Sequence, residues 1–197
     1  MTQTILAIDP GSSGGFAWMD ENGTYAFRFG NLTEASIAGE LRAFTQGNNT
    51  FAYIEQVGAC GGGKEGRRQG ANSMFTFGQN YGFLRGLLIG MMIPFEEVRP
   101  QKWLPAMGLR GIKDETQTQK KNRHKAKAEQ LFPHIKCTHA IADALLLCEY
   151  ARRLRSGQLT ATELPPILAT KKKATAKEVA RELSQQFLKN RQFDTRM

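Results

Sequence analysis

The sequence has few cysteines and no long apolar stretch. Its three cysteines form no Cys-x-x-Cys motif and leave an odd one over, so neither a disulfide framework nor a zinc knuckle is expected. The N-terminal residues lack the basic region and apolar core of a secretory signal. The most apolar stretch, residues 83–95, contains Arg85 and is too short to span a bilayer. These features predict a protein of a reducing, cytoplasmic compartment.

Acidic residues are outnumbered. The chain has 27 Lys and Arg against 18 Asp and Glu, a formal charge of +9 and a pI near 9.7, which favours a polyanionic partner. The excess is local: net charges are −3 for residues 1–98, +7 for 99–136, −2 for 137–150 and +7 for 151–197. An acidic centre between basic segments resembles a cation site beside a phosphate-binding surface, although two solvated helix faces explain the charges equally well.

The hydrophobic pattern predicts an α/β domain. Short apolar runs at 4–9, 15–19, 25–29, 51–57 and 94–99 read as strands, the first three forming an antiparallel meander. Helical periodicity follows Thr33 and recurs at 75–92, 120–131 and 139–154. The order predicts a mixed five-stranded sheet flanked by helices. We expect the domain to cover residues 1–157, and residues 158–197 to form a basic tail that is partly helical or disordered.

Two features need a reason beyond the core. Residues 58–73 contain six glycines together with Lys64, Arg67 and Arg68, which predicts a basic loop. The helix at 75–92 carries glycine at every fourth position from 78 to 90, at a cost of roughly 1 kcal/mol each relative to alanine. Close packing against the sheet or against a twin helix would explain this stripe equally well.

Three acids lie where charge is costly. Asp9 ends an apolar strand, Glu55 interrupts another, and Asp143 lies in a nearly uniform apolar helix, four residues after His139. Neighbouring strands would bring Asp9 and Glu55 together, and one helical turn puts His139 and Asp143 on one face. Carboxylates and an imidazole that converge suit Mg²⁺ or Mn²⁺ better than zinc.

Each residue taken alone has a simpler explanation. Asp9 is explained by a turn at Asp-Pro-Gly, Glu55 by an ion pair with an arginine such as Arg85, and Asp143 by a local cap or pair. His139 alone is more often a helix N-terminal or core residue than a ligand. The metal-site interpretation depends on the joint pattern, because all these explanations must otherwise coincide.

The ordered set of motifs resembles a known family. The segments Ile-Leu-Ala-Ile-Asp-Pro-Gly-Ser-Ser-Gly-Gly, Tyr-Ile-Glu-Gln-Val, Phe-Gly-Gln-Asn-Tyr-Gly-Phe-Leu-Arg-Gly, Val-Arg-Pro-Gln-Lys-Trp and His-Ala-Ile-Ala-Asp-Ala-Leu-Leu-Leu are similar to the RuvC family of Holliday-junction resolvases, most closely its phage-type branch. The resemblance covers about residues 4–155. If the chain is phage-encoded, its compartment is the host cytoplasm.

The resemblance implies a ribonuclease-H-like fold, a homodimer and hydrolysis of DNA phosphodiesters with two Mg²⁺ or Mn²⁺ ions per active site. By position, Asp9, Glu55 and Asp143 match the metal-binding acids of the family. Bacterial members have a further acid three residues before the last aspartate, where this chain has Ala140. His139 is the candidate for that fourth catalytic and metal-binding position.

Other residues are candidates for DNA contact. They are the loop cations, the first aromatic residue after the loop, and the basic cluster before the last helix: Lys64, Arg67, Arg68, Phe75, Lys120, Lys121, Arg123 and Lys125. Cations neutralise phosphates, and an exposed aromatic ring can wedge between bases. For Phe75 and its neighbours Phe77 and Tyr81 the alternative is a place in the core; we favour the core for Tyr81 and keep Phe75 as the candidate wedge.

Three other functional classes compete with a junction resolvase. A two-domain sugar-kinase or actin-like ATPase shares the strand-turn start, but 197 residues are too few for both domains. A non-catalytic junction-binding protein would not need all three acids. A nuclease of broader specificity for branched or flap DNA is the closest alternative, and the sequence does not separate it from a resolvase.

Overall fold

The computed structural model describes residues 3–56 and 71–159, and of residues 71–73 only the backbone. In chain order the elements are β1 (Thr4–Asp9), β2 (Gly15–Asp20), β3 (Gly23–Arg28), α1 (Glu34–Thr45), β4 (Thr50–Glu55), α2 (Ala71–Gly90), β5 (Phe95–Val98), α3 (Pro100–Ala106), α4 (Gln117–Leu131) and α5 (His139–Arg155). The predicted loop cations Lys64, Arg67 and Arg68 lie outside the described residues, as do residues 160–197 of the predicted tail.

The strands form one mixed sheet in the order β3-β2-β1-β4-β5. The first three strands pair antiparallel, and β4 pairs parallel with both β1 and β5. The register sets Ile8 opposite Ile54, which brings the next residues, Asp9 and Glu55, to the same level at the carboxyl ends of two adjacent central strands. The predicted five-stranded sheet and its meander are confirmed.

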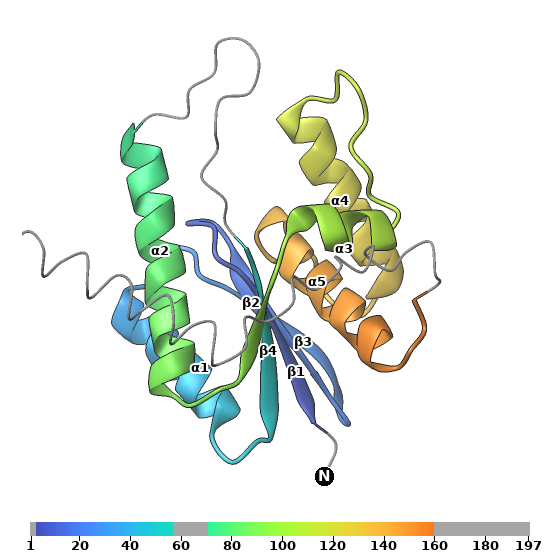
Figure 1. The fold of residues 1–197 in the computed structure, drawn as a ribbon. Helices are drawn as coiled ribbons and strands as arrows, with labels where there is room; N and C mark the ends of the chain where they lie inside the picture. Colours follow the sequence, from blue (N-terminus) through green and yellow to red (C-terminus); the bar gives the residue numbers. More distant parts are fainter. Residues whose placement is uncertain (1–2, 57–70, 160–197) are drawn as a thin grey trace, which may run out of the picture. The chain divides into compact units, whose positions relative to one another are not determined.

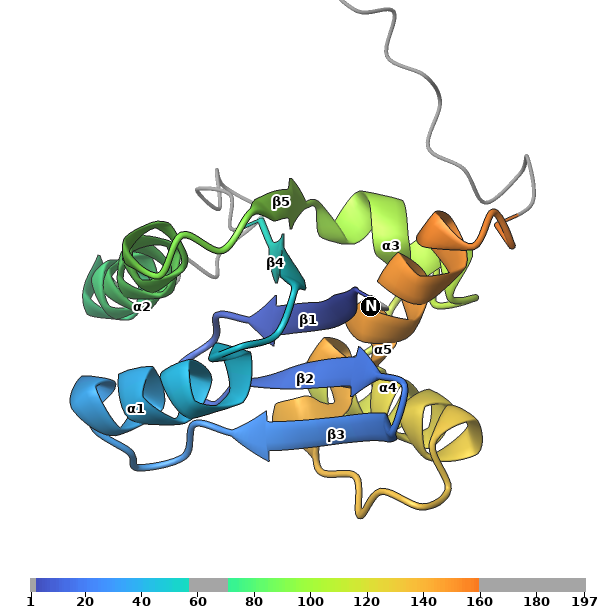
Figure 2. The same ribbon diagram turned by 90° about the horizontal axis from the view of Figure 1, so that it is seen from below.

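Helices cover both faces of the sheet. Figures 1 and 2 show α1 and α2 on one face and α3, α4 and α5 on the other. Strand alternation divides the core accordingly, because successive side chains point to opposite faces. Leu6 and Ile8 of β1 pack with Leu84 and Leu88 of α2 in one cluster, whereas Ile5 and Ala7 belong to the cluster that includes α5. By the same alternation, odd-numbered Asp9 and Glu55 belong to the α5 face.

Of the three helices on that face, α5 is the most deeply buried. From Ala144 to Ala151 every residue of α5 is buried, and the helix contacts β1, β2, β3 and β4. It ends at Arg155 with Ser156 as the C-cap, and Gly157 follows with a φ of 66°, the left-handed conformation that glycine adopts readily. A charged residue near the start of this helix is therefore held against the sheet by a long apolar anchor. That residue is Asp143.

Two interpretations of the apolar segments are corrected by the structure. The glycine stripe of α2 does not pack on its own sheet, because a Cβ added at Gly78, Gly82, Gly86 or Gly90 would meet nothing within 4 Å. Arg85 does not pair with Glu55; its Nε lies 2.6 Å from Oε1 of Glu97 on β5. Among the described residues no helix is long and apolar enough to cross a membrane, and both described cysteines are free.

Candidate active site

The turn after β1 is built around the Asp9 side chain. Its Oδ1 accepts a hydrogen bond of 3.0 Å from the backbone N–H of Gly11, and the N–H of Gly14 donates to the carbonyl of Gly11 at 2.8 Å. A Cβ on Gly14 would lie 2.3 Å from the Asp9 carbonyl oxygen and 3.0 Å from its Cγ. Only glycine fits so close to the backbone. The turn explanation for Asp9 is thus correct, and the same turn fixes its carboxylate.

Asp9, Glu55 and Asp143 influence one another electrostatically. Burial raises the pKa of Asp9 to about 6, and the negative charge of Asp143 adds to this, while the Gly11 N–H and Lys121 oppose it. Burial raises the pKa of Glu55 to about 8, and the charges of Asp9 and Asp143 raise it further. The three acids that the sequence singled out therefore lie near enough at one end of the sheet to influence one another's ionisation, in a setting that disfavours the fully charged state.

Trp103 of α3 contributes to the same corner. Its side chain is buried and its indole N–H lowers the pKa of Glu55, as a nearby donor does, although its geometry falls short of a full hydrogen bond. The indole also lies edge-on to the ring of His124, with centroids 6.3 Å apart and planes at 69°. Trp103 thus lies close to both Glu55 and His124 of α4.

Helix α4 brings two polar side chains to the first turn of α5. Nδ1 of His124 lies 2.6 Å from Oδ1 of Asp143, and Nε2 of His139 lies 2.9 Å from Oδ1 of Asn122. Asp143 therefore has a partner from another helix, not the local cap or pair considered above. His139 is exposed and paired with an amide, so its function as a metal ligand stays a prediction.

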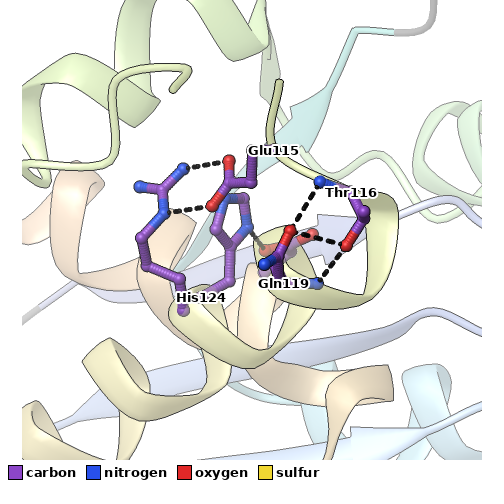
Figure 3. Close-up of polar contacts among 6 residues, drawn as sticks. Glu115, Thr116, Gln119 and His124 are labelled. Carbon is purple, nitrogen blue, oxygen red and sulfur yellow. Dashed lines mark hydrogen bonds and ion pairs between the residues drawn. The ribbon is translucent and has the colours of Figure 1, made fainter. Parts of the chain in front are cut away.

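The basic residues of α4 fall into two groups. Arg123 donates two hydrogen bonds of 2.8 Å to the carboxylate of Glu115, and Lys125 lies 3.2 Å from Glu129 (Figure 3 shows the Glu115 contact beside His124). Lys120 and Lys121 form no ion pair with the described part of the chain. These two lysines instead lower the pKa of Glu55 and Asp9 respectively, which means that their charges act on the site.

The described acids are not arranged as a complete metal-binding cluster. Within residues 3–56 and 71–159, no group of three or more His, Cys, Asp and Glu side chains is arranged closely enough to hold a metal ion. The donor chemistry nevertheless fits a hard divalent cation, because all three acids offer carboxylate oxygens. A cation would also relieve the mutual repulsion that raises the pKa of Asp9 and Glu55.

His124 and Trp103 are the site residues that the sequence interpretation missed. The segment around His124 is rich in lysine and arginine. Because these charges dominate the sequence, the pattern of buried residues on one face of α4 is difficult to recognise. His124 and Ala128 are buried and four residues apart, and Lys121 lies on the same face one turn earlier. A histidine within the apolar stripe of a basic helix was the available signal.

The fold class follows from the architecture: a mixed five-stranded sheet in the order β3-β2-β1-β4-β5 with helices on both faces is a ribonuclease-H-like arrangement. RuvC of Thermus thermophilus in complex with a Holliday junction substrate has this fold; it aligns over 81% of this chain and 99% of its own, with a TM-score of 0.50 and 12% identity. A second T. thermophilus RuvC structure aligns over 80% and 99%, at a TM-score of 0.48 and 13% identity. The sheet order and the first of these alignments give the chain the ribonuclease-H-like fold of RuvC. No family model and no curated protein sequence matches it.

Proposed function

We propose that this chain is a metal-dependent endonuclease that resolves four-way DNA junctions. The observation that carries the proposal is the convergence of Asp9, Glu55 and Asp143, each on a different element, at one end of a RuvC-like sheet. A buried structural acid is normally paired with a cation. Glu55 has no ion pair with the described residues and its pKa is about 8, a poor arrangement for stability alone.

The three carboxylates would hold one or two Mg²⁺ or Mn²⁺ ions. Bound there, such ions supply an activated water and neutralise charge on the leaving oxygen. The protein contributes a fixed carboxylate in the Asp9 turn, and a Glu55 that carries a proton at neutral pH until a cation displaces it. His139, at the first turn of α5, is the candidate for a fourth ligand.

Lys120 and Lys121 are the best candidates for binding the scissile phosphate and its neighbours. Both belong to the first turns of α4 and both act electrostatically on the acids. Arg123 and Lys125 form ion pairs with Glu115 and Glu129. They would bind DNA phosphates away from the scissile bond, once these ion pairs are broken. The basic loop and its Lys64, Arg67 and Arg68 remain candidates from sequence.

A homodimer would use α2. From Met74, where side chains are described, the one charged residue of this helix is Arg85, whose side chain is 43% exposed and paired with Glu97. The exposed positions include the open glycine stripe as well as Ile89, which is 60% exposed, and Phe75, which is 68% exposed. Stripes of glycine let two helix backbones approach closely, so a second copy of α2 is the partner that fits this face.

Phe75 also stays a candidate wedge that inserts between bases of the junction. The cytoplasmic location of the protein stays a prediction.

The variant Asp143→Asn tests the proposed activity. It keeps the shape of the side chain and removes its charge, so we expect cleavage of a synthetic four-way junction to fall at least a hundredfold while the junction is still bound. Glu40→Gln, an exposed acid on α1, is the matched control and should cleave like the wild type. Retained cleavage by Asp143→Asn would remove this residue from the active site, and binding without cleavage by the wild type would indicate a non-catalytic junction-binding protein.

A further inference from the structure

The contact between His124 and Asp143 suggests a function for a residue outside the acidic cluster. His124 is 3% exposed, and its Nδ1 lies 2.6 Å from Oδ1 of Asp143, whose side chain is 32% exposed. The two residues come from different helices and are 19 positions apart. The His124 ring is already held by its buried surroundings, whereas the Asp143 side chain is partly exposed. The short contact therefore restricts the orientation of the Asp143 carboxylate more than that of the ring.

The direction of this hydrogen bond follows from its chemistry. An ionised carboxylate only accepts hydrogen bonds, so Nδ1 carries the proton and donates it. Nε2 of His124 is buried and has no hydrogen-bond partner among the described residues. The 2.6 Å contact with Asp143 therefore makes Nδ1 the protonated, donating nitrogen of the ring.

The position of the imidazole is itself firmly held. Trp103 packs edge-on against the ring. The N-terminus of α4 is fixed by a capping box, in which the Thr116 hydroxyl accepts from the Gln119 N–H and the Gln119 side chain accepts from the Thr116 N–H (Figure 3). The adjacent contact of Asn122 with His139 ties the same stretch of α4 to the start of α5. His124 is thus preorganised before any ligand binds.

We infer that His124 is a positioning residue, whose Nδ1–H donates to Oδ1 of Asp143 and orients this carboxylate toward Asp9 and Glu55. The bond engages Oδ1, and Oδ2, which accepts no hydrogen bond within the described residues, is left as the less encumbered oxygen for a cation. This inference rests on the proposed function, because Asp143 needs a set orientation only if it binds a ligand. Partners of this kind typically change metal affinity or activity by roughly 10–100-fold when they are removed.

Two variants separate orientation from packing. His124→Leu fills the space without a donor, whereas His124→Asn places an amide N–H close to the position of Nδ1. We expect His124→Leu to bind Mn²⁺ roughly 10-fold more weakly by titration calorimetry and to lose at least 10-fold in kcat, with KM for the junction changed less than about 3-fold. His124→Asn should stay within about 3-fold of the wild type in both. A merely structural residue would not give this split or this rescue.

A spectroscopic measurement tests the inference apart from nuclease activity. In the ¹⁵N-histidine-labelled, metal-free protein we expect Nδ1 of His124 to carry a proton, and we expect its Nδ1 signal to shift in Asp143→Asn. A His124 ring protonated on Nε2 alone, or wild-type Mn²⁺ affinity and kcat in His124→Leu, would overturn the inference. If the wild type cleaves no DNA, the proposed function fails while the protonation of Nδ1 and the Mn²⁺ titration still decide the function of His124.

Discussion

Replacing Glu55 with glutamine should stabilise the metal-free protein, in a way that depends on pH. The pKa of Glu55 is about 8 in the folded protein against 4.5 for the free side chain. A raised carboxyl pKa means that the folded state holds a proton that the unfolded state releases above pH 4.5. Stability is therefore fully present below that pH and is lost progressively as pH rises to about 8. Glutamine has no proton to release, so the variant escapes this loss.

The magnitude follows from the shift. At pH 7 the difference of 2.5 between the pH and the free pKa corresponds to about 3 kcal/mol as an upper bound. Glu55 is only partly buried, and solvent screening reduces the effect to roughly 1–2 kcal/mol. For a chain of this size, that is a rise in Tm of about 2–8 °C at pH 7, with no difference near pH 4.

Thermal unfolding in EDTA between pH 4 and pH 9 measures this effect. The difference between Glu55→Gln and the wild type should grow with pH and level off near pH 8, whereas Glu40→Gln should stay within about 0.5 kcal/mol throughout. Millimolar Mg²⁺ should narrow the gap at pH 8 by stabilising the wild type more than the variant. A difference that is constant with pH, or a less stable variant at pH 8, would refute the electrostatic reasoning.

The remaining predictions address DNA binding, assembly and the β1 turn. Replacing Lys120 and Lys121 together with alanine should weaken junction binding and reduce the slope of log affinity against log salt by about 1–2; an unchanged slope in a salt titration would show that neither lysine contacts phosphate. Gly82→Glu should shift the protein from dimer to monomer in analytical ultracentrifugation without lowering its helix content. Gly39→Glu on α1 is the control and should leave the dimer intact. A dimer that persists in Gly82→Glu would show that α2 is not the interface. Gly14→Ala should lower stability by at least 1 kcal/mol and impair cleavage, because the added methyl group meets backbone at 2.3 Å; wild-type denaturation and cleavage curves would contradict this.

The fold was predictable because its signals are local and repetitive. β1 is a short apolar run ended by Asp-Pro-Gly, and α5 has apolar residues at helical spacing and is followed by Ser156 and Gly157. Element boundaries were less accurate: α4 begins at Gln117, three residues before the prediction, because the capping box of Thr116 and Gln119 was not recognised. Such caps depend on two polar residues that also occur in many turns.

The site was only partly predictable. Asp9 and Glu55 follow from strand pairing, since adjacent parallel strands end at one edge of the sheet. The contact between His124 and Asp143 joins two helices whose relative register has no sequence pattern, and a run of lysines hides the histidine. For Arg85 the sequence suggested a contact that does not exist. Arg85 follows a buried leucine on α2 and pairs with Glu97 of β5, on the face of the sheet opposite to Glu55.

Cleavage of a synthetic four-way junction, compared with a matched linear duplex and a flap, tests the central claim most directly. With Mg²⁺ or Mn²⁺ present, the account predicts paired and symmetric nicks in the junction, no cutting of the duplex, and no activity in EDTA. Equal cutting of the flap would indicate a nuclease of broader specificity for branched DNA. Cleavage that continues in EDTA, or an absence of cleavage with every substrate and both metals, would contradict the account.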